Sequence, residues 1–217
     1  MDHAAVVFDF DGLLMDTERC LTASWQYEWR QHGLDLELET FWVDHGADVS
    51  EERYRRLADA VGVSYDRAAS HARREAFRSG LLAGLDLSPG IANWLAQARD
   101  AGLRLAIASS SSREWVQGLL RRVGRERDFE VYACGDEVAR AKPAPDVYRL
   151  ALERLDLPAA AAVAVEDSAH GVAAAKAAGL RCIAIPNPHV GPSRCEHADL
   201  VLRSATDRRL AEALAMI

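Results

Sequence analysis

The chain has 217 residues, of which 49% are hydrophobic, so it can form one large domain or a core with a smaller insertion. Its formal net charge of -7 argues against nucleic acid or an anionic membrane surface as a partner. No apolar run approaches the roughly 20 residues that span a bilayer, and the first residues lack the basic stretch of a signal peptide. The four cysteines show no zinc-type spacing, and we expect a reduced, cytoplasmic protein.

The first predicted element is a strand over residues 4–8, a short apolar run rich in β-branched residues and typical of a strand buried on both faces. It ends in Asp9 and Asp11, and Gly12 then indicates that the chain leaves the sheet. Carboxylates at the C-terminal end of a buried parallel strand lie where open α/β sheets bind ligands. The alternative is that both aspartates only cap the next helix.

Residues 16–85 are predicted to be entirely helical. Asp16 or Thr17 can cap a helix in which Trp25 and Trp29 share one face. Trp25, Trp29 and Trp42 either pack this block or line a pocket for a sugar. Further helices are predicted over Leu36 to Val43, Ser50 to Val61 and Ser64 to Leu82.

Beyond residue 86 the predicted strands and helices alternate. The strands are Leu103 to Ala108, Phe129 to Cys134, Ala162 to Val165, Arg181 to Ile185 and Asp199 to Leu202. The helices are Ser88 to Ala101, Arg113 to Val123, Pro145 to Leu155, Ala169 to Ala178 and one near the C-terminus. This alternation predicts an α/β fold, a doubly wound parallel sheet with right-handed crossovers. Residues 1–15 and 86–217 then form a core domain into which the all-α domain 16–85 is inserted.

Polar side chains follow several predicted strands at the points where those strands end. Asp9 and Asp11 follow the first strand, Ser109 follows the second, and Glu166 with Asp167 follows the fourth. The C-terminal ends of parallel strands lie along one edge, so these clusters are expected to converge. Two carboxylates about 4 Å apart repel by roughly 4 kcal/mol at an effective dielectric constant of 20, so the site needs a cation.

The chemistry of this edge favours phosphoryl transfer. An oxygen-only ligand set selects a hard divalent ion, with Mg²⁺ as the expected cofactor. Lys142 adds a positive charge suited to a phosphate, and Ser109 adds a hydroxyl. An aspartate can attack phosphorus to form an aspartyl-phosphate, while a second acid two residues away protonates the leaving alkoxide.

Four motifs resemble those of the haloacid dehalogenase-like hydrolase superfamily, in the branch of β-phosphoglucomutase and sugar-phosphate phosphatases with a helical cap. They are Asp9-Phe10-Asp11-Gly12, Ile107-Ala108-Ser109, Lys142-Pro143-Ala144-Pro145-Asp146, and Val165-Glu166-Asp167-Ser168 with Gly171. The resemblance covers essentially the whole chain. It implies a Rossmann-like core, with residues 16–85 as a cap that closes over the cleft.

The same resemblance implies a role for each matching residue. Asp9 would be the nucleophile and a metal ligand, and Asp11 the acid and base whose backbone carbonyl binds Mg²⁺. Asp167 would ligate the metal, with Glu166 supporting it directly or through water. Ser109 and Lys142 are implied to hold the phosphate. Ser110, by its position, and Phe10 and Gly12 are further candidates for phosphate binding.

Several activities within the superfamily can be separated by single residues. Dehalogenases lack the second acid of the first motif, so Asp11 argues for phosphate chemistry. Phosphonate-cleaving relatives need a cap lysine, and no lysine lies between Thr17 and Leu85. A β-phosphoglucomutase needs a cap arginine in a glycine-containing loop, whereas the loop around His45 and Gly46 is acidic. Hydrolysis is therefore favoured, with a sugar phosphomutase and a non-catalytic ligand-binding relative as the alternatives.

The substrate is expected to be a small phosphorylated metabolite, and the protein a monomer or weak homodimer. His45, Gly46 and Arg53 are the candidates for substrate specificity in the cap. Ser111 and Ser112 either contact substrate or cap the following helix. His170 is interpreted as support for the metal-binding loop rather than as a catalytic base.

Overall fold

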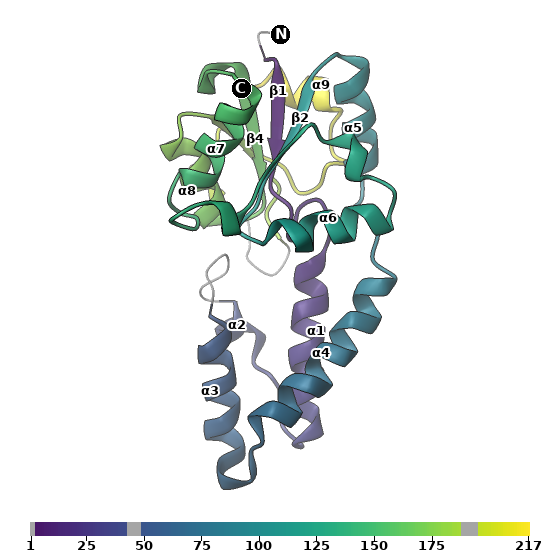
Figure 1. Ribbon diagram of the computed structural model, residues 1–217, viewed down its shortest axis with the longest axis vertical. Helices are drawn as coiled ribbons and strands as arrows, with labels where there is room; N and C mark the ends of the chain where they lie inside the picture. Colours follow the sequence, from purple (N-terminus) through teal and green to yellow (C-terminus); the bar gives the residue numbers. More distant parts are fainter. Residues whose placement is uncertain (1–2, 43–48, 188–194) are drawn as a thin grey trace. The chain divides into compact units, whose positions relative to one another are not determined.

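The computed structural model describes residues 3–42, 49–187 and 195–217. The chain divides into two compact units, Met1–Met15 with Asp86–Ile217, here called the sheet unit, and Asp16–Leu85, called the helical unit. Figure 1 shows the helices and strands of both units along the chain. None of the described helices is long and apolar enough to cross a bilayer.

The sheet unit is built on six strands in the order β3-β2-β1-β4-β5-β6, and all of their pairings are parallel. At the end of the central strand, Phe8 pairs with Ile107 on one side and Val165 on the other. The predicted doubly wound parallel sheet is confirmed. The strands are β1 (Ala5–Phe8), β2 (Arg104–Ala108), β3 (Val131–Ala133), β4 (Ala162–Glu166), β5 (Arg181–Ala184) and β6 (Leu200–Val201).

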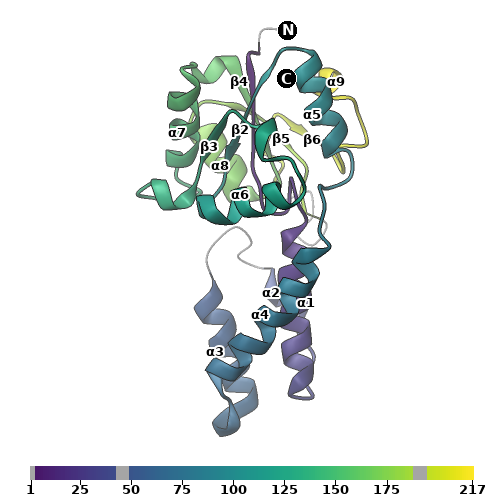
Figure 2. The same cartoon turned by 45° about the vertical axis from the view of Figure 1, so that its right-hand side comes forward.

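Helices cover both faces of this sheet. Side chains alternate along β1, so that Ala5 and Val7 join a core with buried residues of α7 (Asp146–Leu155) and α8 (Ala169–Ala177). The helices α5 (Ile91–Asp100) and α9 (Leu210–Leu214) lie on the other side of the sheet in Figures 1 and 2. The remaining helix, α6 (Arg113–Arg122), follows β2. The strands run between two helical layers, so they are apolar on both faces.

The helical unit contains α1 (Thr17–Gln31), α2 (Leu38–Phe41), α3 (Ser50–Val61) and α4 (Arg67–Ala83), and no strand among its described residues. Asp16 caps α1 by accepting a hydrogen bond from the backbone N–H of Arg19 (3.1 Å), one of the two predicted caps. The Trp25 ring packs edge-on against Tyr54, with 4.7 Å between the ring centroids. Glu28 is fully buried, and the Arg73 guanidinium neutralises it at 2.5 Å.

Two predicted helices of this unit begin later than the sequence indicated. The helix expected over residues 36–43 is the single turn α2, because Glu37 has extended backbone and makes no side-chain cap. The start predicted at Ser64 is also wrong, since Ser64 ends a 3-10 turn. Asp66 caps α4 instead and accepts a hydrogen bond from the backbone N–H of Ala69 (3.0 Å).

The helix expected from Ser88 and Pro89 begins only at Ile91, because Gly90 forms a turn first. Gly90 has a φ of 85°, in the left-handed region that favours glycine. A Cβ at this position would lie 2.6 Å from the backbone carbon of Ala205. The close approach of the Gly90 turn to the backbone at Ala205 therefore determines where α5 begins.

Candidate active site

Asp9 is the first residue beyond β1, and the sheet itself fixes its position. Its backbone N–H donates to the carbonyl of Val165 (2.9 Å), which extends the pairing of β1 with β4 by one residue. Phe10 is fully buried and anchors the following turn by accepting a hydrogen bond from Leu14 N–H (3.0 Å). Gly12 has a φ of 81°, which a residue with a Cβ rarely adopts. The carboxylate of Asp9 is thus held at the C-terminal edge of the sheet.

Lys142 reaches this edge from the loop before α7 and is almost fully buried. Its ammonium group donates to Asp9 Oδ1 (2.5 Å), Glu166 Oε1 (2.7 Å) and the carbonyl of Ala108 (2.8 Å). The Lys142 ammonium group therefore links Asp9, which follows β1, with the last residues of β2 and β4, Ala108 and Glu166. A buried charge with this many partners fixes the carboxylates that it contacts.

Glu166 ends β4 and is fully buried. The Tyr148 hydroxyl donates to Glu166 Oε1 (2.7 Å), and the Asp167 backbone N–H donates to Oε2 (3.2 Å). A Cβ at Gly171 would lie 1.9 Å from Oε2, so α8 approaches this carboxylate as only a glycine allows. Both oxygens of Glu166 are engaged, which holds the side chain in one orientation.

Asp9, Glu166 and Asp167 form a buried group in which one carboxylate oxygen of each residue lies within 4.8 Å of those of the other two. Burial raises the pKa of Asp9 well above its usual value; the charge of Lys142 opposes this, and the charge of Glu166 adds to it. Burial and the charge of Glu166 likewise raise the pKa of Asp167. One lysine does not balance three carboxylates, and the oxygen-only donor set fits a hard divalent cation such as Mg²⁺.

Asp11 does not join that group of three carboxylates. Its Oδ2 accepts a hydrogen bond from the Ser111 hydroxyl (2.6 Å), and its Oδ1 accepts one from the Trp115 indole N–H (2.9 Å). The metal role predicted for Asp11 concerned its backbone carbonyl and stays a prediction. The carboxylate itself is held by two neutral donors.

The serines after β2 have distinct positions. The Ser109 backbone N–H donates to the carbonyl of Ala133 (3.0 Å), and its hydroxyl accepts from the Ser111 N–H (3.0 Å). Ser112 caps α6 by accepting a hydrogen bond from Trp115 N–H (3.3 Å), so the capping alternative is confirmed for this residue. Ser110 is exposed, and the phosphate-binding roles of Ser109 and Ser110 stay predictions.

A family model described as haloacid dehalogenase-like hydrolase matches residues 3–179, which include every residue of this site. The chain belongs to this family. It is 32% identical over 185 residues to a Thermotoga maritima protein named phosphorylated carbohydrates phosphatase, covering 82% of this chain and 83% of that one.

Solved structures of two relatives contain phosphorus ligands. A mutant of CbbY from Rhodobacter sphaeroides, in complex with xylulose-(1,5)bisphosphate, is 35% identical with a TM-score of 0.71, covering 94% of this chain and 96% of that one. A hydrolase of the family from Deinococcus radiodurans, with bound phosphate and sodium, is 29% identical with a TM-score of 0.84, covering 99% of this chain and 96% of that one.

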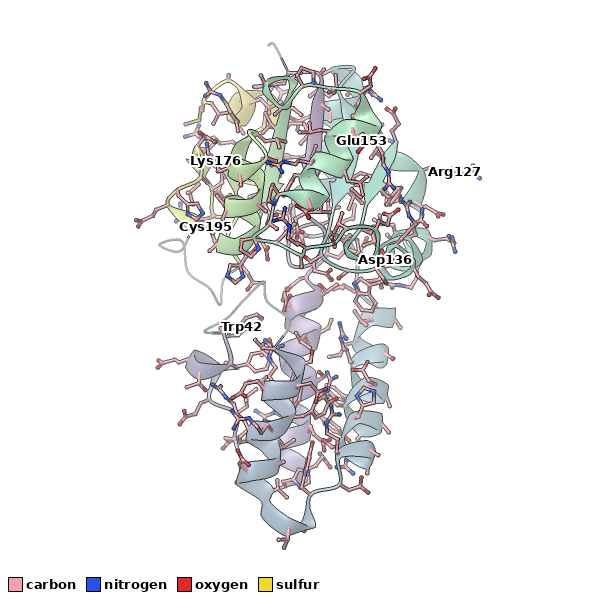
Figure 3. The ribbon with its side chains drawn as sticks, turned by 60° about the vertical axis from the view of Figure 1, so that its left-hand side comes forward. Trp42, Arg127, Asp136, Glu153, Lys176 and Cys195 are labelled. Atoms are coloured by element: carbon pink, nitrogen blue, oxygen red, sulfur yellow. The ribbon has the colours of Figure 1, made fainter. Side chains whose placement is uncertain are left out.

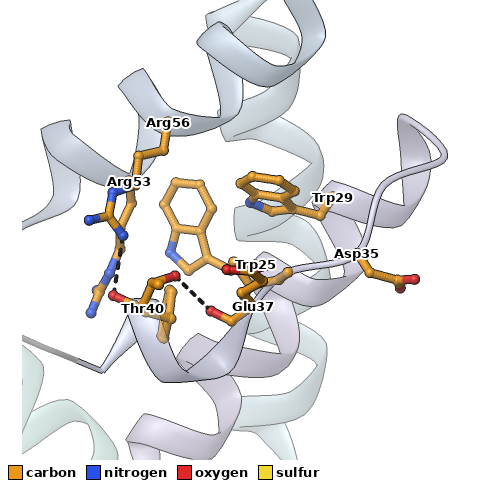
Figure 4. A pocket seen from close by; sticks show the side chains of 9 residues that line it. Trp25, Trp29, Asp35, Glu37, Thr40, Arg53 and Arg56 are labelled. Carbon is orange, nitrogen blue, oxygen red and sulfur yellow. Dashed lines mark hydrogen bonds between the residues drawn. The ribbon is translucent and has the colours of Figure 1, made fainter.

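The helical unit of this hydrolase contains a cavity of about 190 Å³, shown in Figure 4. The indoles of Trp25 and Trp29 line it, together with Arg53, whose guanidinium lies 4.0 Å from the centroid of the Phe41 ring. Trp25 is almost fully buried and therefore packs this unit as well. The predicted specificity residues His45 and Gly46 lie outside the described residues.

Three residues of this hydrolase's site were missed by sequence reasoning: Ser111 as a partner of Asp11, Trp115 and Tyr148. Trp115 lies six residues after Ser109, and Tyr148 six after Lys142, and only the fold brings them to the carboxylates. The interpretation of His170 stays a prediction; among the described residues its Nδ1 has no hydrogen-bond partner. Lys176 lies on α8 (Figure 3) and pairs with Asp199 at 2.7 Å, not with the carboxylates that Lys142 contacts.

A second group of possible metal ligands among the described residues consists of Cys134, Asp136 and Glu137. Arg113 and Arg154 both donate to Glu137, each at 2.9 Å to Oε1. Burial raises the pKa of the Cys134 thiol to about 11. The contacts of Glu137 in this group are ion pairs with the two arginines.

Proposed function

We propose that this hydrolase is a Mg²⁺-dependent phosphatase that acts on a small phosphorylated metabolite, of which a sugar phosphate is the favoured class. The observation that carries the proposal is the buried group of Asp9, Glu166 and Asp167 around Lys142. The relative named as a phosphatase of phosphorylated carbohydrates and the relative complexed with a sugar bisphosphate support the substrate class. All four cysteines are free thiols, which fits a cytoplasmic enzyme.

In the proposed reaction the Asp9 carboxylate attacks phosphorus while the bond from phosphorus to the ester oxygen breaks. Asp11 gives a proton to the departing oxygen, which leaves as an alcohol. A water molecule then attacks the phosphorus of the aspartyl-phosphate, Asp11 takes a proton from that water, and phosphate and free Asp9 are released. Lys142 holds Asp9 Oδ1 and so directs the attacking carboxylate.

Asp9 and Asp167 would hold the magnesium ion with the backbone carbonyl of Asp11, and Glu166 would support it. When bound, Mg²⁺ supplies positive charge that offsets the negative charge of the phosphoryl group and the carboxylates. We further propose that the helical unit is the cap of this enzyme, with Arg53, His45 and Gly46 contributing to specificity. The phosphomutase alternative stays second, because the sequence around His45 and Gly46 is acidic.

The test is hydrolysis of p-nitrophenyl phosphate and of a panel of sugar phosphates by purified protein, with Mg²⁺ and with EDTA. We expect phosphate release that requires Mg²⁺, and loss of turnover in Asp9→Asn by about 10³-fold or more, because an amide is a poor nucleophile. Asp9→Asn should remain folded, as thermal unfolding would show. Turnover by Asp9→Asn near that of the wild type would refute the nucleophile, and wild-type turnover in EDTA would refute the metal.

A further inference from the structure

Trp115 makes a direct hydrogen bond to the residue assigned above as acid and base. Its indole N–H donates to Asp11 Oδ1 (2.9 Å), while the Ser111 hydroxyl donates to Oδ2 (2.6 Å). Asp11 thus has a specific partner on each oxygen. A carboxylate restrained on both oxygens cannot rotate freely about its Cβ–Cγ bond.

The first turn of α6, which carries Trp115, is itself firmly anchored. Ser112 accepts a hydrogen bond from the Trp115 N–H (3.3 Å), and the Arg113 N–H donates to Asp136 Oδ1 (3.1 Å). Val116, the next residue, is fully buried in the sheet unit. The backbone of Trp115 is therefore fixed, and an indole with only two rotatable bonds needs little further ordering.

Ser111 is anchored as well. Its carbonyl accepts a hydrogen bond from the Gly135 N–H (2.9 Å), and its N–H donates to the Ser109 hydroxyl (3.0 Å). A Cβ at Gly135 would lie 2.0 Å from the Ser110 carbonyl oxygen, so the turn after β3 packs directly on this loop. Both partners of Asp11 consequently belong to one rigid part of the sheet unit.

The two partners differ in what they can do with a proton. An indole nitrogen only donates, whereas a hydroxyl both donates and accepts. When Asp11 carries a proton, a proton on Oδ2 preserves the indole hydrogen bond to Oδ1, because the Ser111 hydroxyl can turn from donor to acceptor and the indole cannot. The two donors together therefore distinguish the oxygens of this carboxyl group.

We propose that Trp115 is a positioning residue that orients the Asp11 carboxyl group and makes Oδ2 the oxygen that exchanges protons. The inference rests on the proposed function, because it assigns Asp11 as the general acid. Trp115 should then matter most where a proton must reach the leaving oxygen. That need is small for a p-nitrophenolate leaving group and larger for the more basic phenolate.

The experiment compares p-nitrophenyl phosphate with phenyl phosphate, two esters of similar size, in Trp115→Phe. We expect kcat/KM for phenyl phosphate to fall about tenfold and kcat/KM for p-nitrophenyl phosphate to fall less than about threefold. The quantity kcat/KM is chosen because it covers the steps up to departure of the alcohol. Trp115→His, which keeps a ring N–H, should recover part of the loss on phenyl phosphate.

Trp94→Phe is the matched control, since the Trp94 indole donates to the carbonyl of Arg208 (2.9 Å), a contact of α5 that leaves Asp11 untouched. Trp94→Phe should change kcat/KM by the same factor for both esters. An equal loss on both esters in Trp115→Phe, or a loss confined to KM, would overturn the inference and make Trp115 a structural or substrate-contacting residue.

Asp11→Asn separates this inference from the function on which it rests. If Asp11→Asn shows the same preference for the better leaving group but Trp115→Phe does not, only the positioning role fails. If Asp11→Asn shows no such preference, the acid assignment fails and the positioning role with it. Thermal unfolding of each variant verifies that it is folded.

Discussion

Lys142 and Lys176 are the two lysines of the chain, and their surroundings are opposite. The Lys142 side chain is 4% exposed and contacts two buried carboxylates, whereas the Lys176 side chain is 38% exposed and contacts one. Burial alone would lower the pKa of Lys142, but the charges of Asp9 and Glu166 outweigh it and raise the pKa. The buried lysine is therefore charged, and the carboxylates around it depend on that charge.

Replacement of Lys142 by Met should destabilise the protein strongly. The variant leaves the buried carboxylates of Asp9 and Glu166 without their cation, and breaking a buried ion pair from one side costs about 3–5 kcal/mol. Lys176→Met should cost less than about 1 kcal/mol, because the exposed pair is well hydrated. Urea unfolding at pH 7 measures the free energy of unfolding of both variants. Similar small losses of stability in the two would contradict the claim that the buried carboxylates depend on the charge of Lys142.

Two helical glycines provide a second comparison at the residue scale. A Cβ at Gly171 would meet Glu166 Oε2 at 1.9 Å, whereas a Cβ at Gly118 on α6 meets nothing within 4 Å. Glu166 cannot move aside easily, because Lys142 and Tyr148 hold it. The same substitution to alanine should therefore have opposite effects at these two positions.

Gly171→Ala should lower the free energy of unfolding by about 1–3 kcal/mol through overpacking, and should weaken activation by Mg²⁺ by moving Glu166. Gly118→Ala should raise the free energy of unfolding by up to about 1 kcal/mol, because alanine favours a helix. Urea unfolding and a Mg²⁺ titration of activity measure the two effects. A Gly171→Ala variant as stable as Gly118→Ala would mean that the close approach to Glu166 is relaxed.

The motifs predicted which residues of the site lie together, but not every contact among them. The alternation of strands and helices predicts a parallel sheet, and parallel strands end at one edge. This is why the structure brings together Asp9, Lys142, Glu166 and Asp167. Trp115 was not predicted, because the local sequence around an aromatic residue in the first turn of a helix does not indicate which distant residue it contacts. Its role depends on a contact across 104 residues of sequence.

At the scale of elements, Glu137 ties three parts of the sheet unit together after β3. Its carboxylate accepts hydrogen bonds from Arg113 at the start of α6, from Arg154 near the end of α7 and from the Cys134 N–H. Burial opposes the charge, but these donors outweigh burial and lower the pKa of Glu137 to about 2. The folded pKa lies below the usual value, so the interaction stabilises the fold above about pH 4.5.

Glu137→Gln should therefore lower the free energy of unfolding by about 1–3 kcal/mol at pH 7, since charged hydrogen bonds to two helices are weakened. The difference from the wild type should shrink as the pH falls from 4.5 towards 2, where the wild-type carboxylate also becomes protonated. Glu126→Gln, which affects one exposed pair with Arg121, should stay within about 0.5 kcal/mol. Urea unfolding from pH 7 to pH 3 is the measurement, and a difference independent of pH would contradict the account.

The order of strands and helices was predictable because buried parallel strands are short apolar runs and the segments between them have helical periodicity. Helix starts were less predictable, because several residues near each start can cap. Ser64 and Asp66 are both suitable N-caps, and only the structure shows that Asp66 accepts from Ala69. At α5 the start depends on the distant segment at Ala205, which no local pattern contains.

For the whole molecule, formation of the site and folding are a single event. Lys142 is separated from Asp9 by 133 residues and from Glu166 by 24, so the unfolded chain has no preformed cluster. The folded sheet brings three carboxylates together in a buried position at a cost that one lysine does not offset. A cation that binds only the folded chain must then stabilise the entire protein.

Mg²⁺ should accordingly raise the midpoint of thermal unfolding. The free energy of unfolding should increase with the logarithm of the Mg²⁺ concentration once this exceeds the dissociation constant, by about 2.7 kcal/mol in total at one hundred times that constant. Asp167→Asn removes one carboxylate of the group and should abolish most of this stabilisation while raising the midpoint of the metal-free protein, since it relieves repulsion among buried acids. NaCl at equal ionic strength controls for general screening of a chain with net charge -7. Equal shifts with Mg²⁺ and NaCl, or an unchanged Mg²⁺ shift in Asp167→Asn, would mean that the carboxylates meet at the sheet edge for a reason other than holding a metal.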